Sequence, residues 1–284
     1  MPMGDALAIP IAYELAMARA HIGTSGWNYK HWWNGEFYPQ ELRPAYWLRY
    51  FARHFDTVEI NNSFYRLPSE ETFQNWRIQV PQDFVFAVKA SRFLTHIKRL
   101  KDPEDPLDLF FSRAKFLGHR LGPVLFQLPP GLKLNLERLE IFLTALAAHT
   151  AGDKLRCAIE VRDVSWLVPQ VFELLRAHHV ALCFADWRET HVTDPVTAGF
   201  VYVRRHAGPA DGGNYPKQTL DRDAEQIHRW LAAGLDVYVY FNNDWGGHAI
   251  RNAKYVRKAV LSAGSGRQKQ AVRSTKLPDS LKRS

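Results

Sequence analysis

The sequence predicts a single-domain TIM (β/α)8-type barrel, with parallel strands inside and helices outside. Three observations lead to this prediction. Eight short apolar runs follow one another along the chain, helix-like segments separate most of them, and each run ends in a polar residue. The length of 284 residues suits one such barrel, which typically takes about 250.

The predicted strands are apolar runs of the kind found in buried parallel sheets. In chain order they are 21–25, 57–61, 84–89, 123–127, 157–162, 181–186, 200–204 and 237–243. Alternation with helices implies parallel pairing through right-handed crossovers. An open doubly wound sheet is the alternative fold, and it usually carries a glycine-rich phosphate loop after the first strand. The glycines Gly23 and Gly26 do not fit that fingerprint, so the barrel is preferred.

Most gaps between the strands carry apolar residues at helical spacing. The first predicted helix, 44–55, opens with Pro44, which suits a first helical turn. Ser69, followed by two glutamates, has the pattern of an N-cap with an acidic first turn, and Ser165 is a second candidate N-cap. The later predicted helices are 105–121, 135–149, 165–178, 221–233 and 247–263. The segment 187–198 is the least helical.

Basic residues outnumber acidic ones, 37 to 29, which gives a formal net charge of +8. The last 20 residues, 265–284, hold six Lys or Arg and one Asp and so contribute +5. This segment has few large apolar residues, so we expect it to be disordered. The chain is therefore divided into an N-terminal extension (1–20), a barrel domain (21–263) and a basic disordered tail (264–284).

The two cysteines, Cys157 and Cys183, lie in predicted buried strands, which suits a reducing cytoplasm. If the fifth and sixth strands are neighbours in register, both sulfurs are expected on the helix-facing side. No apolar stretch approaches the roughly 20 residues that span a bilayer, and the first 20 residues lack the features of a signal peptide. We expect a cytoplasmic protein with no membrane partner, and the oligomeric state is left open.

Charged and amide side chains are expected to converge at the upper mouth of the barrel. Side chains alternate along a strand, and the active site of this fold lies at the carboxyl ends of its strands. The residues that this alternation places together are Glu59, Asn61, Lys89, Gln127, Glu160, Arg162, Asp186, Arg204 and His206. Burying so many charges is costly unless they pair or bind a ligand. A purely structural ion-pair network is the alternative interpretation.

Several motifs make the sequence resemble a known family from about residue 21 to 263. The main ones are Gly23–Tyr29 (GTSGWNY), Thr57–Pro68 (TVEINNSFYRLP), Gln127–Pro130 (QLPP) and Tyr240–Asn243 (YFNN). They are similar to motifs of the YecE-like family, known as domain of unknown function 72. The resemblance implies a TIM-barrel relative and leaves the activity open.

Glu59 and Glu160 are the leading candidates for acid–base catalysis. A carboxyl in a dry barrel mouth has a raised pKa, whereas a nearby cation lowers it, so two carboxyls in different surroundings can divide the roles of acid and base. Asp186 and His206 complete the predicted catalytic set, because an imidazole past a strand end transfers protons readily.

The predicted substrate-binding residues combine cations, amides and aromatic rings. Lys89, Arg162 and Arg204 are expected to hold an anionic group, since arginine binds phosphate or carboxylate through two donors. Aromatic rings near the mouth stack on sugars or bases. The full set is Trp27, Tyr29, Asn61, Tyr65, Lys89, His96, Gln127, Arg162, Arg204, Asn242 and Asn243.

The sequence thus predicts an enzyme (a hydrolase, lyase or isomerase) that acts on a small substrate bearing phosphate or carboxylate. It requires no cofactor, although a divalent metal held by Glu59, Glu160, Asp186, His96 and His206 is an alternative. A nucleic-acid-binding protein resembling metal-dependent phosphodiesterases is the second hypothesis, supported by the net charge and the tail. A non-catalytic barrel that binds a metabolite is the third.

Overall fold

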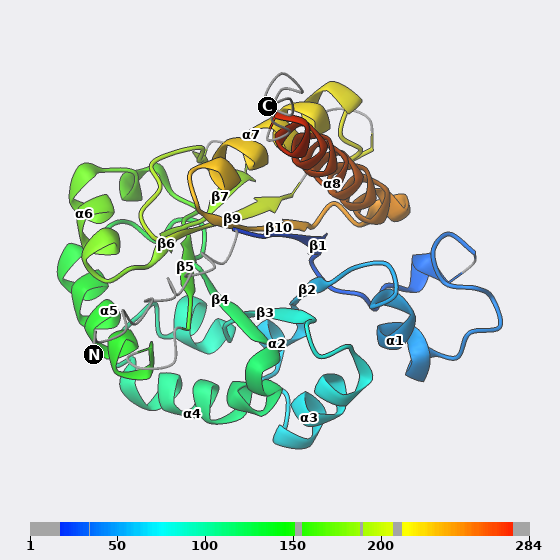
Figure 1. The fold of residues 1–284 in the computed structure, drawn as a ribbon. Coiled ribbons are helices and arrows are strands. Elements are labelled where there is room, and N and C mark those ends of the chain that lie inside the picture. The colour runs from blue at the N-terminus through cyan, green and yellow to red at the C-terminus, as the bar shows by residue number, and fades with distance from the viewer. Residues whose placement is uncertain (1–17, 34, 151–154, 188–189, 207–211, 275–284) are drawn as a thin grey trace, which may run out of the picture.

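The computed structural model describes residues 18–274 except 34, 151–154, 188–189 and 207–211. The strands form the centre of the molecule and the helices lie around them (Figure 1). The strands are β1 (Ala20–Thr24), β2 (Thr57–Ile60), β3 (Val85–Lys89), β4 (Leu121–Gln127), β5 (Cys157–Glu160), β6 (Ala181–Leu182), β7 (Phe184–Trp187), β8 (Thr190–His191), β9 (Phe200–Arg205) and β10 (Asp236–Phe241). The eight predicted strands are confirmed, with the sixth divided into β6 and β7.

The hydrogen-bonded ladder comprises two five-stranded sheets, ordered β2-β3-β4-β5-β6 and β1-β10-β9-β7-β8. All pairs are parallel except the β7–β8 hairpin. The sheets meet at two seams, so the ladder is not continuous around the barrel. At one seam Ser25 and Glu59 form an isolated parallel bridge. At the other, Cys183 lies between β6, which pairs with β5, and β7, which pairs with β9.

Gly23 is required at the first seam. A Cβ atom there would lie 2.3 Å from the backbone oxygen of Thr57, so only glycine lets β1 approach β2 this closely. The amide of Gly26 continues the contact and donates to the Glu59 carbonyl at 2.8 Å. The glycines of the first motif therefore position the end of β1 against the end of β2, where Ser25 and Glu59 meet.

The helices are α1 (Trp47–Phe51), α2 (Asn62–Tyr65), α3 (Glu70–Gln79), α4 (Glu104–Ala114), α5 (Leu136–Thr150), α6 (Pro169–Ala177), α7 (Lys217–Ala232) and α8 (His248–Ser274). Ser69 caps α3 as predicted, since its Oγ accepts from the Thr72 amide at 3.2 Å. Ser165 is not an N-cap. It lies in a short 3-10 turn capped by Asp163, and the helix begins after it, with proline at its first position.

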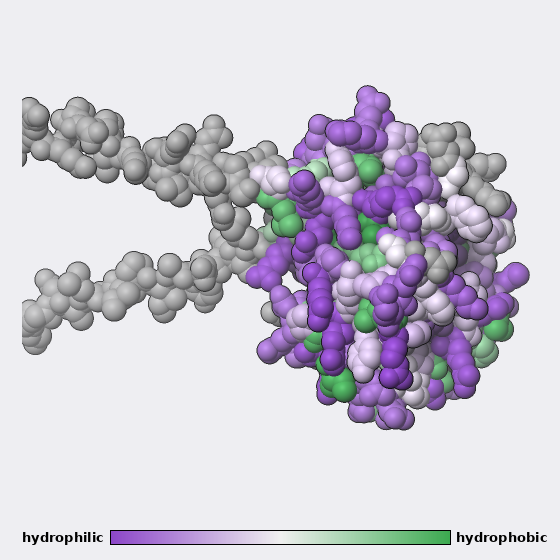
Figure 2. Space-filling model, turned by 90° about the vertical axis from the view of Figure 1, so that its right-hand side faces the viewer, coloured by the Kyte–Doolittle hydropathy of each residue, from purple (hydrophilic) through white to green (hydrophobic). Residues whose placement is uncertain are grey.

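The C-terminal helix α8 continues through Ser274. The first part of the predicted disordered tail is therefore helical, and residues 275–284 lie outside the described part of the chain, as does most of the predicted N-terminal extension. No helix in the described ranges is long and apolar enough to cross a membrane. The face in Figure 2, on the side of α1, shows apolar residues scattered among hydrophilic ones.

Two apolar clusters form the core. The larger lies between the strands and the helices, and the smaller fills the inside of the barrel, where alanines oppose large residues such as Tyr202 and Tyr240. Cys157 belongs to the outer cluster and Cys183 to the inner one. The prediction that both sulfurs lie on the helix-facing side is therefore wrong. Ala181, Cys183 and Ala185 alternate regularly into the barrel, so Asp186, from which the position of Cys183 was counted, faces outward.

Candidate active site

A buried ion-pair cluster forms the floor of the barrel mouth. Arg204, near the end of β9, donates through Nη1 to Glu160 Oε2 at 2.6 Å and through Nη2 to Glu59 Oε1 at 2.7 Å. All three side chains are almost completely shielded from solvent. One guanidinium thus links carboxylates from β2 and β5, on opposite sides of the barrel interior, and each compensates the cost of burying the others.

Hydroxyl groups complete the surroundings of Glu59. Tyr202 OH donates to its Oε2 at 2.7 Å, and Ser25 Oγ donates to its Oε1. Ser25 Oγ in turn accepts from Arg204 Nη2 at 3.1 Å and from Asn61 Nδ2 at 2.6 Å. Both oxygens of Glu59 therefore have protein partners. The carboxylate is buried among these partners and does not lie in the open part of the mouth.

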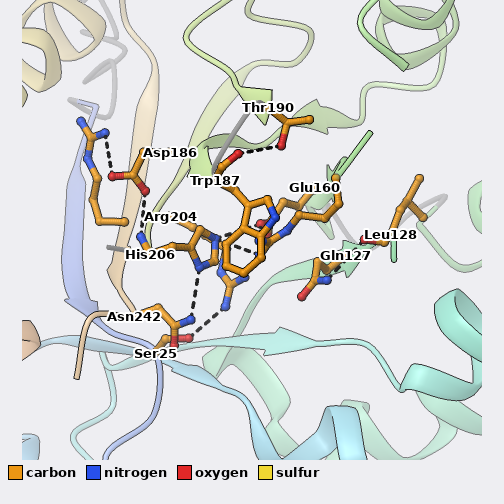
Figure 3. Close-up of polar contacts among 12 residues, drawn as sticks. Ser25, Gln127, Leu128, Glu160, Asp186, Trp187, Thr190, Arg204, His206 and Asn242 are labelled. Atoms are coloured by element: carbon orange, nitrogen blue, oxygen red, sulfur yellow. Dashed lines mark hydrogen bonds and ion pairs between the residues drawn. The ribbon is translucent and has the colours of Figure 1, made fainter. Parts of the chain in front are cut away.

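Glu160 has a second set of partners on its other oxygen. Its Oε1 lies 2.5 Å from Arg162 Nη2 and 2.8 Å from His206 Nε2 (Figure 3). Burial by itself would raise the pKa of Glu160, but Arg204, His206 and Arg162 outweigh it and hold that pKa well below its usual value. Glu160 is therefore a permanent anion, and the expectation of a raised carboxyl pKa does not apply to it.

The hydrogen bonds of His206 assign its tautomer. Its Nδ1 lies 3.2 Å from the amide nitrogen of Asn242, which donates to it. Nε2 lies 2.8 Å from Glu160 Oε1, which accepts, and 3.1 Å from Arg162 Nη2, which donates, and we assign its proton to the shorter contact with the carboxylate. Burial, together with the neighbouring arginines, lowers the pKa of His206 despite the attraction of Glu160, so the ring is neutral at pH 7. A chain of contacts thus runs from Asn242 through His206 and Glu160 to Arg162.

Lys89, at the end of β3, lines the mouth and pairs with no carboxylate among the residues that the structure describes. The residue is 8% exposed, and Nζ lies 4.0 Å from the centre of the Phe64 ring. This Nζ forms no hydrogen bond or ion pair with any residue that the structure describes. Burial, reinforced by Arg204 and Arg162, lowers the pKa of Lys89 to about 7 despite the two glutamates. Both the ammonium and the neutral amine form of Lys89 are therefore populated near pH 7.

Two hollows open beside this floor. A cavity of about 590 Å³ lies over the ends of β1, β2, β3 and β10 and is lined by Lys89, Asn61 and Asn242. A smaller one of about 250 Å³ includes Arg162, Lys133 and Trp187. The chain of contacts through His206 and Glu160 joins the residues of the two hollows.

Asp186 does not face the mouth with the glutamates, so its predicted position is wrong. Its neighbour Ala185 faces the interior of the barrel, which places Asp186 on the other face of β7. Its carboxylate accepts from the backbone amide of His206 at 2.8 Å (Figure 3). It also accepts from the Tyr215 hydroxyl, and Arg205 lies 3.7 Å away. Asp186 thus anchors the backbone of His206.

Asn243 is also turned away from the mouth, because its amide donates to the Gly213 carbonyl at 2.8 Å. The predicted residues Trp27, Tyr29 and Tyr65 do line the larger cavity. Gln127 donates to the neighbouring Leu128 carbonyl at 3.3 Å.

His96 lies in a π-helical turn after β3, edge-on to Phe64 at 4.8 Å between ring centres. Burial and Lys89 lower its pKa to about 4. His96 is therefore neutral at pH 7, and it contacts the same Phe64 ring as Lys89 does.

Three residues at the mouth were not among the predicted site residues. Trp187 stacks on Arg162, with 3.7 Å between the guanidinium carbon and the ring centre. Ser25 and Tyr202 hold Glu59. Tyr202 was detectable, because it shares the strand face of Arg204. Trp187 was missed because the alternation was counted from Asp186 as an inward residue, whereas Ala185 is the one that faces inward.

The predicted metal-binding arrangement is not found. Within the described ranges no three His, Cys, Asp or Glu side chains come together as metal ligands. Arg204 lies between Glu59 and Glu160, and Asp186 is on another face, so the five proposed ligands do not converge.

Comparisons with known proteins agree with the fold. Residues 21–276 match the family described as "Protein of unknown function DUF72". The chain is 26% identical to the UPF0759 protein YunF of Bacillus subtilis, over 87% of this chain and 96% of YunF. It is 37% identical to YecE of Escherichia coli over 29% of this chain and 30% of YecE. A crystal structure of a DUF72 family protein from Thermotoga maritima superposes with a TM-score of 0.74 at 27% identity, covering 86% of this chain and 99% of that one.

Proposed function

This chain belongs to the DUF72 family of proteins of unknown function, and from that premise we propose that it is an enzyme that binds a small anionic substrate at the barrel mouth and transfers a proton through Lys89. One observation carries the proposal. Lys89 faces a cavity of about 590 Å³ as a nearly buried amine that pairs with no carboxylate in the described ranges. A buried cation that is not paired destabilises the fold unless a ligand uses it.

The charges of the mouth favour an anion. Arg204 and Arg162 are matched by Glu59 and Glu160, so protonated Lys89 adds one uncompensated positive charge. An anionic group beside Nζ restores neutrality and stabilises the ammonium form. The same charge balance explains why the substrate is expected to carry phosphate or carboxylate.

Lys89 replaces the glutamates as the proton-transferring group of the proposal. A general acid or base works best when its pKa lies near the operating pH, and the pKa of Lys89 is about 7. Both glutamates are inaccessible to solvent and saturated with donors. Their proposed role is to position Arg204, Arg162 and His206 around the substrate.

The test combines the titration of Lys89 with a search for turnover. We expect nitrogen-detected NMR of lysine side chains to show one signal that titrates near pH 7 and disappears in Lys89→Met. Incubation of carboxylate and phosphate compounds in D2O is then screened for protein-dependent exchange of carbon-bound hydrogen, with Lys89→Met as the inactive comparison. An ordinary lysine titration, or exchange that survives Lys89→Met, overturns the proposal.

The two other hypotheses, nucleic-acid binding and metabolite binding without turnover, stay predictions. Salt-sensitive binding of DNA or RNA that survives removal of residues 265–284 would support the first. Tight binding of a small molecule without hydrogen exchange would support the second.

A further inference from the structure

The larger cavity at the mouth is lined by aromatic residues, by amide residues and by one lysine. Its aromatic lining residues are Trp27, Tyr29, Tyr65 and Trp76. Its amide lining residues are Asn28, Asn61, Asn62, Gln79 and Asn242. Lys89 is the one charged side chain among the lining residues that the structure describes. The cavity therefore offers rings, neutral donors and acceptors, and a single cation.

We infer that this cavity takes a monosaccharide that carries an anionic substituent, with the sugar ring against the aromatic and amide walls and the anion at Lys89. This inference rests on the proposed function, whose anionic substrate it makes specific. A volume of about 590 Å³ falls within the range of about 300–1,000 Å³ that is usual for small-molecule sites.

The amides favour hydroxyl groups as ligands. An amide side chain both donates and accepts, and so does a hydroxyl. The amides come from the loop after β1, from α2 and the residue before it, from α3 and from the residue after β10. They therefore approach from several directions, as the hydroxyls of a sugar ring do. Asn61 Oδ1 is buried and has no hydrogen-bond partner within the described ranges. A ligand hydroxyl would supply the missing donor.

The aromatic rings favour a sugar over a nucleobase. Trp27 and Trp76 meet edge to face, with ring centres 5.2 Å apart and planes at 88°, so these two rings do not sandwich a flat base between parallel faces. A sugar needs only one exposed aromatic ring face, against which its C–H groups pack. Tyr65 is 74% exposed and lies on the same cavity, where it provides a second apolar surface.

Lys89 determines where the anion lies. No Asp or Glu lines the cavity among the described residues, so no carboxylate competes for Nζ or repels the ligand. Phosphate and carboxylate share the chemistry that Nζ recognises. Sugar phosphates and sugar acids are therefore the two classes that the experiment must separate.

Calorimetric titration of the full chain tests the inference. The probes are glucose 6-phosphate, glucuronate, glucose, inorganic phosphate, acetate and cytidine monophosphate. We expect one of the two anionic sugars to bind at least tenfold more tightly than glucose, phosphate, acetate and the nucleotide. The preferred anionic sugar identifies phosphate or carboxylate as the substituent.

Substitutions of residues that line the cavity test whether the sugar binds there. Trp27→Leu and, separately, Asn28→Ala on the exposed loop are expected to lower the affinity for the anionic sugar at least tenfold. The affinity for inorganic phosphate is expected to change by less than twofold. Trp245→Leu is the matched control, because Trp245 is 77% exposed and does not line the cavity. It is expected to change neither affinity.

Each contrary result points to a different error. Anionic sugars that bind no more tightly than phosphate or acetate overturn the sugar inference and leave the proposed function intact. If glucose binds as tightly as the anionic sugars, the placement of the anion at Lys89 is wrong. A preference for the nucleotide assigns the cavity to a base. If no anion binds and Lys89 titrates as an ordinary lysine, the proposed function and this inference fall together.

Discussion

Arg204 and Glu160, which are 44 positions apart in the sequence, meet inside the barrel at 2.6 Å, and neither side chain is accessible to solvent. The second nitrogen of the guanidinium reaches Glu59. A buried charge is tolerated when its partners are placed around it before a ligand arrives. The contact between Arg204 and Glu160 is therefore the central ion pair of the buried cluster beneath the barrel mouth.

Arg204→Met should be strongly destabilising. It leaves two buried carboxylates without their shared cation, and breaking such a pair costs about 3–5 kcal/mol. Urea denaturation measures the loss. Arg251→Met is the matched control, because Arg251 pairs with Glu36 on the surface, where an ion pair contributes about 0–1 kcal/mol. A loss at Arg204 as small as that of the control would contradict a buried network.

Lys89→Met should stabilise the protein while it removes anion binding. The pKa of Lys89 falls from 10.5 to about 7 on folding. The unfolded chain therefore binds a proton that the folded chain lacks between pH 7 and 10.5, and stability rises with pH across that window. Below pH 7 the burial penalty is complete and corresponds to at most about 5 kcal/mol.

Methionine avoids the penalty, so the gain in the free energy of unfolding should be largest at pH 6 and fade toward pH 10. Thermal and urea unfolding at both pH values measure it. Lys98→Met, which removes a lysine paired with Asp102 at the surface, should show no such pH-dependent gain. A variant that is less stable at every pH would assign Lys89 to the framework instead of the site.

Binding of an anion should take up a fraction of a proton near pH 7.5. Lys89 is then mostly neutral, and a bound anion favours its ammonium form. Calorimetry of one ligand in buffers of different ionisation enthalpy measures the uptake. The affinity should weaken by about tenfold per pH unit above 7. Neither effect should appear in Lys89→Met, and release of a proton would argue against the proposal.

His206 should be the Nε2-protonated tautomer and should stay neutral below its usual titration range. Asn242 donates to Nδ1, and burial lowers the imidazole pKa. Nitrogen NMR of histidine-labelled protein distinguishes the two tautomers directly. Asn242→Ala removes the donor and should mix them. A Nδ1-protonated ring in the unaltered protein would show that the amide of Asn242 is oriented the other way.

The local pattern of the sequence determined much of the barrel. The strands could be located because each is a short apolar run, and Ser69 could be identified as a cap because capping needs only residues three positions apart. Alternation along β2, β5 and β9 correctly placed Glu59, Glu160 and Arg204 inside the barrel. These predictions succeed because the physics that decides them acts between residues near one another in the chain.

Contacts between distant strands decided the rest. The inward face of the sixth predicted strand is one example. Ala181 pairs with Ala158 of β5 and Ala185 with Arg204 of β9, and this register puts Trp187 at the mouth and Asp186 outside it. The low pKa of Glu160 depends chiefly on Arg204, which comes from β9, and Lys89 is distinguished by the absence of an ion-paired carboxylate among the described residues. Composition listed the charges, but only the tertiary structure decided which of them neutralise each other and which one faces the cavity.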